Sequence, residues 1–143
     1  MGTGMADRER RIYWAGGFLY DRDTHSIFLH QRDGNTRSSP HKWAFFGGHN
    51  EGAESAAECF VRELEEEIGL RVRVDEAKWL CEYLNTDTGQ HRIVFYVEKA
   101  VPVEQLVLGE GAGFAWVKIS EAERLDLANK TRDDIRYFLA RPS

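Results

Sequence analysis

The sequence contains few cysteines, few prolines and no long hydrophobic run. Its 143 residues include 2 cysteines and 3 prolines. Cys59 and Cys81 have no CxxC spacing and are too few for a disulfide framework, so we interpret them as reduced thiols of a cytoplasmic protein. No apolar run approaches the roughly 20 residues of a membrane-spanning helix, and the start, MGTGMADRERR, lacks the apolar stretch of a signal peptide. We therefore expect neither a disulfide scaffold nor a membrane protein.

Basic residues are also in deficit. The formal net charge is −5 and the acids are spread along the chain, which argues against binding to a nucleic acid backbone. A small phosphate-bearing ligand held through a divalent metal ion stays compatible with this charge. With 42% hydrophobic and 30% charged residues, the composition is typical of a soluble globular protein. We expect one domain over residues 1–143, with residues 1–10 as a flexible N-terminal tail.

The hydrophobic pattern predicts strands and two helices. Gly16 and Gly17 indicate a bulge or a close approach of two backbones inside the first strand. Gly69 ends the first helix, and Ile135, Phe138 and Leu139 share one side of the second. This order predicts an α/β fold with layers around a mixed sheet. The predicted strands are 11–21, 25–32, 43–48, 71–85, 92–101 and 113–120; the helices are 54–68 and 131–141.

The first helix concentrates acidic residues in the stretch RELEEEIGL. At about 100° per residue, Glu63, Glu66 and Glu67 share one face, whereas Glu65 points away from them. The three acids lie beside the apolar stripe, at the edge of a packed surface where a cleft could form. Their carboxylates are hard oxygen ligands that suit Mg²⁺ or Mn²⁺. The alternative is a solvated acidic stripe without a ligand. The stripe consists of Ala57, Phe60, Val61, Leu64 and Ile68.

The surrounding segment 48–70, GHNEGAESAAECFVRELEEEIGL, favours the metal site. Gly48 is followed after five residues by Glu54, and seven more residues lead to Arg62-Glu63. The segment resembles the Nudix box, the 23-residue signature of the Nudix hydrolase family, and fills each of its defined positions. The resemblance implies an α/β/α sandwich in which the acid-bearing helix packs against a mixed sheet.

The resemblance also implies roles for the residues of the box. Glu63, Glu66 and Glu67 would bind Mg²⁺, with the carbonyl of Gly47 as an additional ligand. Arg62 would orient these glutamates and Glu54 would support the loop before the helix. Gly47 and Gly48 let the backbone turn tightly and approach a ligand closely.

The implied activity is Mg²⁺-dependent hydrolysis of a nucleoside diphosphate linked to another group. Glu67 is the first choice for the general base that accepts a proton from water, with Glu66 and Arg62 assisting catalysis. Glu110 is the second choice. It precedes Trp116 by six residues, which resembles the extra metal-binding glutamate of MutT-type members. An exposed loop acid is the alternative interpretation of Glu110.

Three residues outside the box are candidates for substrate binding. Asn129 lies where MutT-type enzymes have a base-recognising asparagine, although it could simply begin the last helix. Trp43 could stack on a base or belong to a core strand. Arg32 could reach a phosphate or be an ordinary polar loop residue. The family often has a proline where Phe46 stands, and this departure affects the pocket wall rather than the metal site.

The marks of several subfamilies are absent, which favours a compact MutT-like enzyme that converts a nucleoside or deoxynucleoside triphosphate to a monophosphate and pyrophosphate. The alternatives are an ADP-ribose or sugar-nucleotide hydrolase and a non-catalytic Nudix-like nucleotide sensor. Sensor domains typically lose glutamates of the box, and none is lost here. A homodimer is compatible with the family, but no interface can be read from one sequence.

Overall fold

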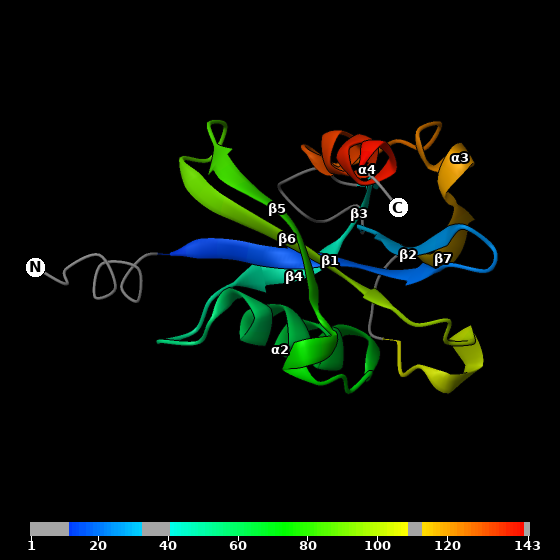
Figure 1. Cartoon of the computed structure of the whole chain (residues 1–143), viewed down its shortest axis with the longest axis horizontal. Coiled ribbons are helices and arrows are strands. Elements are labelled where there is room, and N and C mark those ends of the chain that lie inside the picture. The colour runs from blue at the N-terminus through cyan, green and yellow to red at the C-terminus, as the bar shows by residue number, and fades with distance from the viewer. Residues whose placement is uncertain (1–11, 33–40, 109–112, 142–143) are drawn as a thin grey trace, which may run out of the picture.

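The computed structural model describes residues 12–32, 41–108 and 113–141 (Figure 1). The predicted tail 1–10 and Glu110 lie outside the described residues. None of the described helices is long and apolar enough to cross a membrane. In chain order the elements are β1 (Tyr13–Asp21), β2 (Ser26–Gln31), β3 (Trp43–Ala44), β4 (Phe46–His49), α2 (Ala56–Ile68), the 3₁₀ helix η1 (Val74–Glu76), β5 (Lys78–Asn85), β6 (Gln90–Glu98), the 3₁₀ helix η2 (Val103–Gln105), β7 (Gly113–Lys118), α3 (Ile119–Ala122) and α4 (Thr131–Ala140).

The strands form one mixed sheet between two layers of helix. Its order is β3-β2-β1-β6-β5, with β4 also paired to β1 and β7 to β2. The β1–β6 pair is parallel and the other strand pairs are antiparallel. Helix α2 covers one face of the sheet, and α3 and α4 lie on the other (Figure 1). The predicted α/β/α sandwich with a mixed sheet is therefore confirmed.

Two hydrophobic clusters fill the space between the layers. Successive side chains of a strand point to opposite faces of the sheet. Tyr13, Ala15 and Leu19 of β1 accordingly belong to the cluster under α2. Phe18 and Tyr20 belong to the cluster under α4, which also contains Ile135 and Phe138 of that helix. Strand β1 thus contributes to both cores and forms the centre of the molecule.

Helix α2 begins and ends through local signals in the sequence. The Ser55 side chain accepts a hydrogen bond from the Glu58 amide, and the Glu58 side chain accepts one from the Ser55 amide, so the two form a capping box. At the other end, Gly69 adopts a left-handed conformation with φ 65° and its amide donates to the carbonyl of Glu65. The helix is two residues shorter than predicted because Ser55 is the cap and Glu54 precedes it.

Three details of the predicted elements were wrong. Segment 43–48 is two strands interrupted at Phe45, because β3 pairs with β2 whereas β4 pairs with β1. The predicted strand 71–85 is a strand only from Lys78 and includes the 3₁₀ helix η1 before it. Leu139 is 50% exposed, because α4 buries the row Thr131, Asp134, Ile135 and Phe138, and Leu139 lies about 100° beyond that row.

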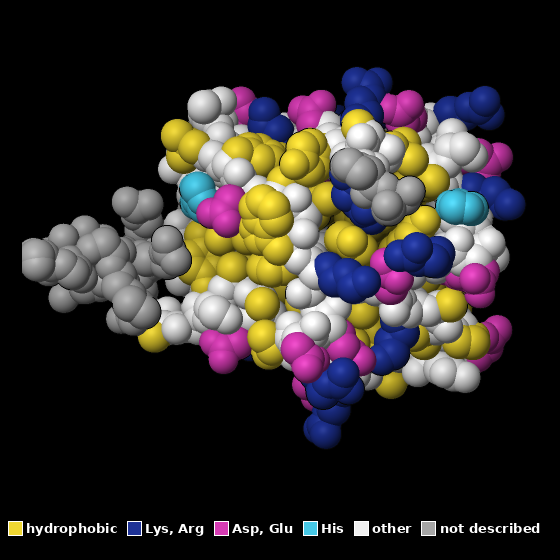
Figure 2. Space-filling view, in the orientation of Figure 1, with side chains coloured by type: hydrophobic (Ala, Val, Ile, Leu, Met, Phe, Trp, Pro, Cys, Tyr) yellow, Lys and Arg dark blue, Asp and Glu magenta, His cyan; other side chains and the backbone are white. Residues whose placement is uncertain are grey.

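Strand β5 ends the sheet on one side. Within the described residues it pairs only with β6, which leaves its outer edge without a neighbouring strand. Trp79 and Leu84 on β5 are 56% and 58% exposed. Figure 2 shows hydrophobic side chains gathered on the face of the molecule where β5 and β6 lie. Exposed edges and apolar side chains of this kind do not by themselves identify a partner, so the homodimer stays a prediction.

Gly16 and Gly17 mark a close approach and not a bulge, because the pairing of β1 with β6 runs through both residues without a shift. A Cβ atom on Gly17 would lie 1.7 Å from the carbonyl oxygen of Phe95, its partner on β6. We expect Gly17→Ala to lower the free energy of unfolding by more than about 3 kcal/mol, since two paired backbones must separate. Chemical denaturation would measure this loss.

Gly113→Ala on β7 is the matched control. Its Cβ atom would make only ordinary contacts, the nearest at 3.5 Å from the Gln31 side chain. We expect its effect to stay within about 0.5 kcal/mol. Equal denaturation midpoints for the two variants would contradict the close approach of β1 and β6.

Candidate active site

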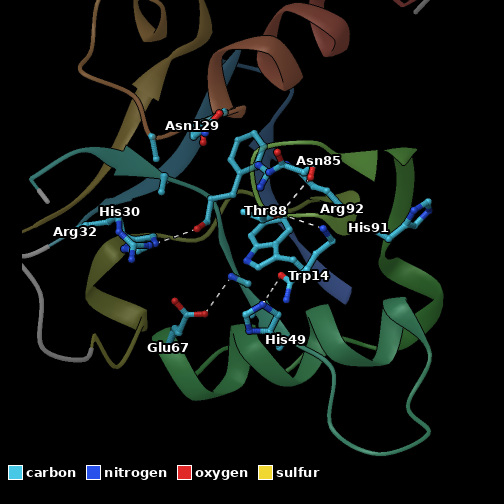
Figure 3. Close-up of a pocket in the computed structure, with 17 residues that line it drawn as sticks. Trp14, His30, Arg32, His49, Glu67, Asn85, Thr88, His91, Arg92 and Asn129 are labelled. Atoms are coloured by element: carbon cyan, nitrogen blue, oxygen red, sulfur yellow. Dashed lines mark hydrogen bonds between the residues drawn. The ribbon is translucent and has the colours of Figure 1, made fainter. Parts of the chain in front are cut away.

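A cavity of about 410 Å³ lies beside the central strands and extends from α2 toward the start of α4. Its volume is within the range of sites that bind small molecules. Glu67 and the Gly47-Gly48 pair line it near α2, and Asn85 and Asn129 line it at the far end. Trp14 lies between these two ends (Figure 3). The cavity therefore combines an acidic end and an end that carries amides, with an aromatic ring between them.

Arg62 joins the acidic face of α2 to the loop that precedes it. Its Nε and Nη2 atoms donate to the two carboxylate oxygens of Glu54 at 3.1 and 2.8 Å. Nη1 contacts Glu63 and Glu66, both at 3.2 Å, and Nη2 also donates to the carbonyl of His49 at 3.1 Å. The hydrogen bonds from Arg62 lower the pKa of Glu54. Arg62 thus fixes the loop and restrains two glutamates at once.

Glu54 and Gly48 bring the loop and the helix close together. The Glu54 carboxylate accepts a hydrogen bond from the Glu51 amide at 2.8 Å, and its carbonyl accepts one from the Tyr13 hydroxyl at 2.5 Å. A Cβ atom on Gly48 would lie 2.4 Å from a carboxylate oxygen of Glu63. The absence of a side chain at Gly48 therefore lets the Glu63 carboxylate rest against β4.

Glu67 is the acidic residue of α2 that lines the cavity. Its carboxylate accepts a hydrogen bond from the Gly47 amide at 3.2 Å. Burial raises the pKa of Glu67, and a hydrogen bond to Glu63 and the charges of Glu63 and Glu66 raise it further. A positive charge placed beside the Glu67 carboxylate would counter this rise in its pKa.

The donor chemistry of this face fits a hard divalent cation. Glu63, Glu66 and Glu67 supply carboxylate oxygens, the ligand type that Mg²⁺ and Mn²⁺ prefer. In the described part of the chain, no three His, Cys, Asp or Glu side chains converge enough to hold an ion. Two of the acids contact Arg62 instead, and the Glu66 side chain, 55% exposed, has room to reorient. The chemistry of these three acids thus fits a metal ion, and their carboxylates would have to move away from Arg62 to bind it.

Of the other predicted site residues, two line the cavity and Trp43 does not. Arg32 and Asn129 line the cavity, and the Asn129 side-chain amide donates to Asp87 at 2.7 Å. Trp43 is not among the lining residues and packs against the cluster under α4. Its backbone binds the segment before Asn129 through two hydrogen bonds of 2.8 Å, one from the Trp43 amide to Asp126 and one from the Ala128 amide to Trp43. Trp43 thus positions the chain that carries Asn129.

Several lining residues were not predicted from the sequence, namely Trp14, Asn85, Thr88 and Arg92. Alternation along β1 puts Trp14 and Gly16 on the same face of the sheet, and this pattern was visible in the sequence. Arg92 carried a weaker signal, as a charge that begins an otherwise apolar strand. Asn85 ends β5 and Thr88 lies in the turn before β6, where polar residues are common, so neither was distinguishable from an ordinary turn residue.

The comparisons with known proteins agree with the fold and with the family resemblance. The NUDIX domain family matches residues 11–141. A comparison with curated proteins finds no match. A MutT structure from a study of Aliivibrio salmonicida and Vibrio cholerae has 26% identity and a TM-score of 0.76, over 92% of this chain and 98% of that chain. The E. coli ORF135 protein has 22% identity and a TM-score of 0.72, over 94% and 92%. A mutT/nudix family protein from Listeria innocua has 23% identity and a TM-score of 0.72, over 90% and 91%.

The chain therefore belongs to the Nudix family. It is a MutT-like hydrolase, an enzyme that acts on phosphoric anhydride bonds. Hydrolases of this family generally use divalent metal ions and bind nucleotide-type substrates.

Proposed function

We propose that the enzyme is a Mg²⁺-dependent pyrophosphohydrolase that converts a nucleoside or deoxynucleoside triphosphate to a monophosphate and pyrophosphate. One observation carries this proposal: a single cavity holds Glu67 near one end and Asn129 at the other, with an aromatic side chain between them (Figure 3). A nucleotide has the same division, with charged phosphates at one end and a flat base with hydrogen-bonding groups at the other.

The acidic end would hold the metal ion and the phosphates. Glu63, Glu66 and Glu67 would bind Mg²⁺, and the family resemblance adds the Gly47 carbonyl and Glu110. When bound, the ion neutralises phosphate charge, polarises phosphoryl oxygens and makes a bound water more acidic. Glu67 lines the cavity and would accept the proton of the attacking water. Arg62 restrains Glu63 and Glu66 through its contacts at 3.2 Å, so it orients the acids.

The far end would recognise the nucleoside. The hydrogen bond to Asp87 fixes the Asn129 amide, and an amide carries both a donor and an acceptor that can read a base. Apart from this end, Arg32 also lines the cavity and would contact a phosphate of the substrate. The free, buried thiols of Cys59 and Cys81 support the assignment to the reducing cytoplasm.

A hydrolysis screen with Mg²⁺ tests this proposal. It would cover canonical and oxidised triphosphates, ADP-ribose, NADH, dinucleoside polyphosphates and sugar nucleotides, with products separated by chromatography. We expect turnover of a triphosphate with release of monophosphate and pyrophosphate, loss of activity with EDTA, and recovery with Mg²⁺ or Mn²⁺. Turnover of ADP-ribose or a sugar nucleotide alone would replace the triphosphate assignment. Tight nucleotide binding without turnover of any compound would support a sensor.

A further inference from the structure

The Trp14 indole lies against two glycines, Gly16 and the cavity-lining Gly47. Gly16 on β1 and Gly47 on β4 face each other as a pair. A Cβ atom on Gly16 would lie 2.4 Å from Cη2 of the indole, and one on Gly47 would lie 2.7 Å from its Cζ2. The indole thus occupies the space that two side chains would need, so the glycines form a seat for this ring.

Arg92 holds the same ring from β6. The parallel register places Trp14 beside Arg92, and the guanidinium carbon lies 4.2 Å from the ring centroid. A cation at this distance over an indole is attracted to the face of the ring. Arg92 itself is held by Asp134 of α4, through a hydrogen bond of 2.9 Å from Nε and an ion-pair contact of 2.8 Å from Nη2. The Asp134 carboxylate also accepts a hydrogen bond from the Tyr83 hydroxyl at 2.7 Å. Gly47 of β4, Arg92 of β6 and Asp134 of α4 thus act together on the position of the Trp14 ring.

The position of Trp14 in the cavity gives this arrangement a function. The ring is half-buried and lines the cavity between Glu67 and Asn129 (Figure 3). A rigid aromatic side chain at such a place offers a surface on which another flat ring can stack, whatever its hydrogen-bonding pattern. Trp43, the aromatic residue predicted for stacking, does not line this cavity.

We propose that Trp14 is the platform on which the flat ring of the substrate stacks, and that Gly16, Gly47, Arg92 and Asp134 position it. The enzyme would then select phosphoric anhydrides that carry an aromatic base over anhydrides without one. This inference rests on the proposed function, because it takes the bound ring to be a nucleobase.

Kinetics of Trp14→Leu and Trp14→Phe test the platform, with the best triphosphate of the screen as substrate. Stacking contributes enough that Trp14→Leu should raise KM about 10- to 100-fold and change kcat only a few-fold. Trp14→Phe keeps a flat ring and should recover most of the affinity. Trp79→Leu is the matched control, because this half-exposed tryptophan of β5 is not among the residues that line the cavity.

Two further measurements separate a platform from a structural role. Any hydrolysis of inorganic tripolyphosphate, which has no ring, should be the same in the wild type and Trp14→Leu. Calorimetric titration with an α,β-methylene triphosphate, carrying the preferred base or adenine, reports ring binding without turnover. Equal Kd and KM in the wild type and Trp14→Leu would overturn the platform, as would an equal loss on tripolyphosphate. If the wild type hydrolyses no triphosphate but Trp14→Leu still loses affinity for the analogue, the proposed function fails and the platform stands.

Discussion

Replacing Glu67 with glutamine should lower kcat about 10²- to 10⁴-fold and leave the fold intact. Glutamine has almost the same shape, and its side-chain oxygen can still accept the hydrogen bond from the Gly47 amide. It lacks the negative charge that binds a metal ion and the basicity that accepts a proton. The measurement is kcat at saturating substrate and Mg²⁺, with circular dichroism to verify folding.

Glu65→Gln is the control on the same helix. Glu65 is exposed and pairs with Arg71 at 3.0 Å on the surface, and such pairs contribute little. Its substitution should leave kcat unchanged within about two-fold. If Glu67→Gln retains nearly wild-type turnover, Glu67 is not the general base and Glu110 becomes the next candidate.

Glu67→Gln should also stabilise the metal-free protein. Burial and the neighbouring acids raise the pKa of Glu67 above its ordinary value. Between the ordinary and the raised pKa, the folded state therefore binds more protons than the unfolded state, and stability falls as pH rises through this window. Glutamine does not ionise, so Glu67→Gln removes this loss of stability. At neutral pH with EDTA we expect it to gain about 1 kcal/mol, or about 3–6 °C in Tm.

Thermal unfolding across pH separates this effect from a general stabilisation. The advantage of Glu67→Gln should vanish at acidic pH, where the wild-type carboxyl is protonated in both states. Added Mg²⁺ should raise the Tm of the wild type more than that of the variant, because the wild type binds the ion more tightly. A Tm difference that does not depend on pH would contradict the repulsion among Glu63, Glu66 and Glu67.

The acid-bearing helix was predictable because its determinants are local. The spacing of Glu63, Glu66 and Glu67 puts them on one face of any α-helix. Ser55 and Glu58 cap the start of the helix and Gly69 ends it, each through hydrogen bonds to nearby residues. The fold class also followed from the order of strands and helices. Such features need no knowledge of which distant segments meet.

The aromatic part of the site, in contrast, depends on contacts between segments that lie far apart in the sequence. Trp14 lies over Gly47 only because β4 pairs with the first half of β1. The sequence does not show this pairing, because the apolar pattern of segment 43–48 predicts one strand and not two. Arg92 and Asp134 are separated by 42 residues and meet because α4 packs over β6. Periodicity shows which face a residue occupies but not its neighbour. The sequence therefore indicates Trp43 as an aromatic candidate and gives no sign of the place of Trp14 in the cavity.

Asp134→Ala should cost about 3–5 kcal/mol of folding free energy, the largest stability effect expected from one substitution outside the glycines. Asp134 is 2% exposed and its carboxylate accepts hydrogen bonds from Arg92 and Tyr83. Its removal leaves the charge of Arg92, itself 8% exposed, without this partner. Urea denaturation measures the loss. Asp133→Ala, next to it on the exposed side of α4, should change stability by less than about 1 kcal/mol.

The double variant Arg92→Met with Asp134→Leu shows what the ion pair is for. Burial raises the pKa of Asp134 although Arg92 opposes this shift, so desolvation outweighs the attraction within the pair. Apolar replacements of similar size should therefore recover most of the stability that Asp134→Ala loses. They should not recover the position of the Trp14 ring, because the cation over it is gone. A stable double variant with a raised KM for the nucleotide would show that the ion pair positions the Trp14 ring. An unchanged KM would show that Gly16 and Gly47 are sufficient to position it.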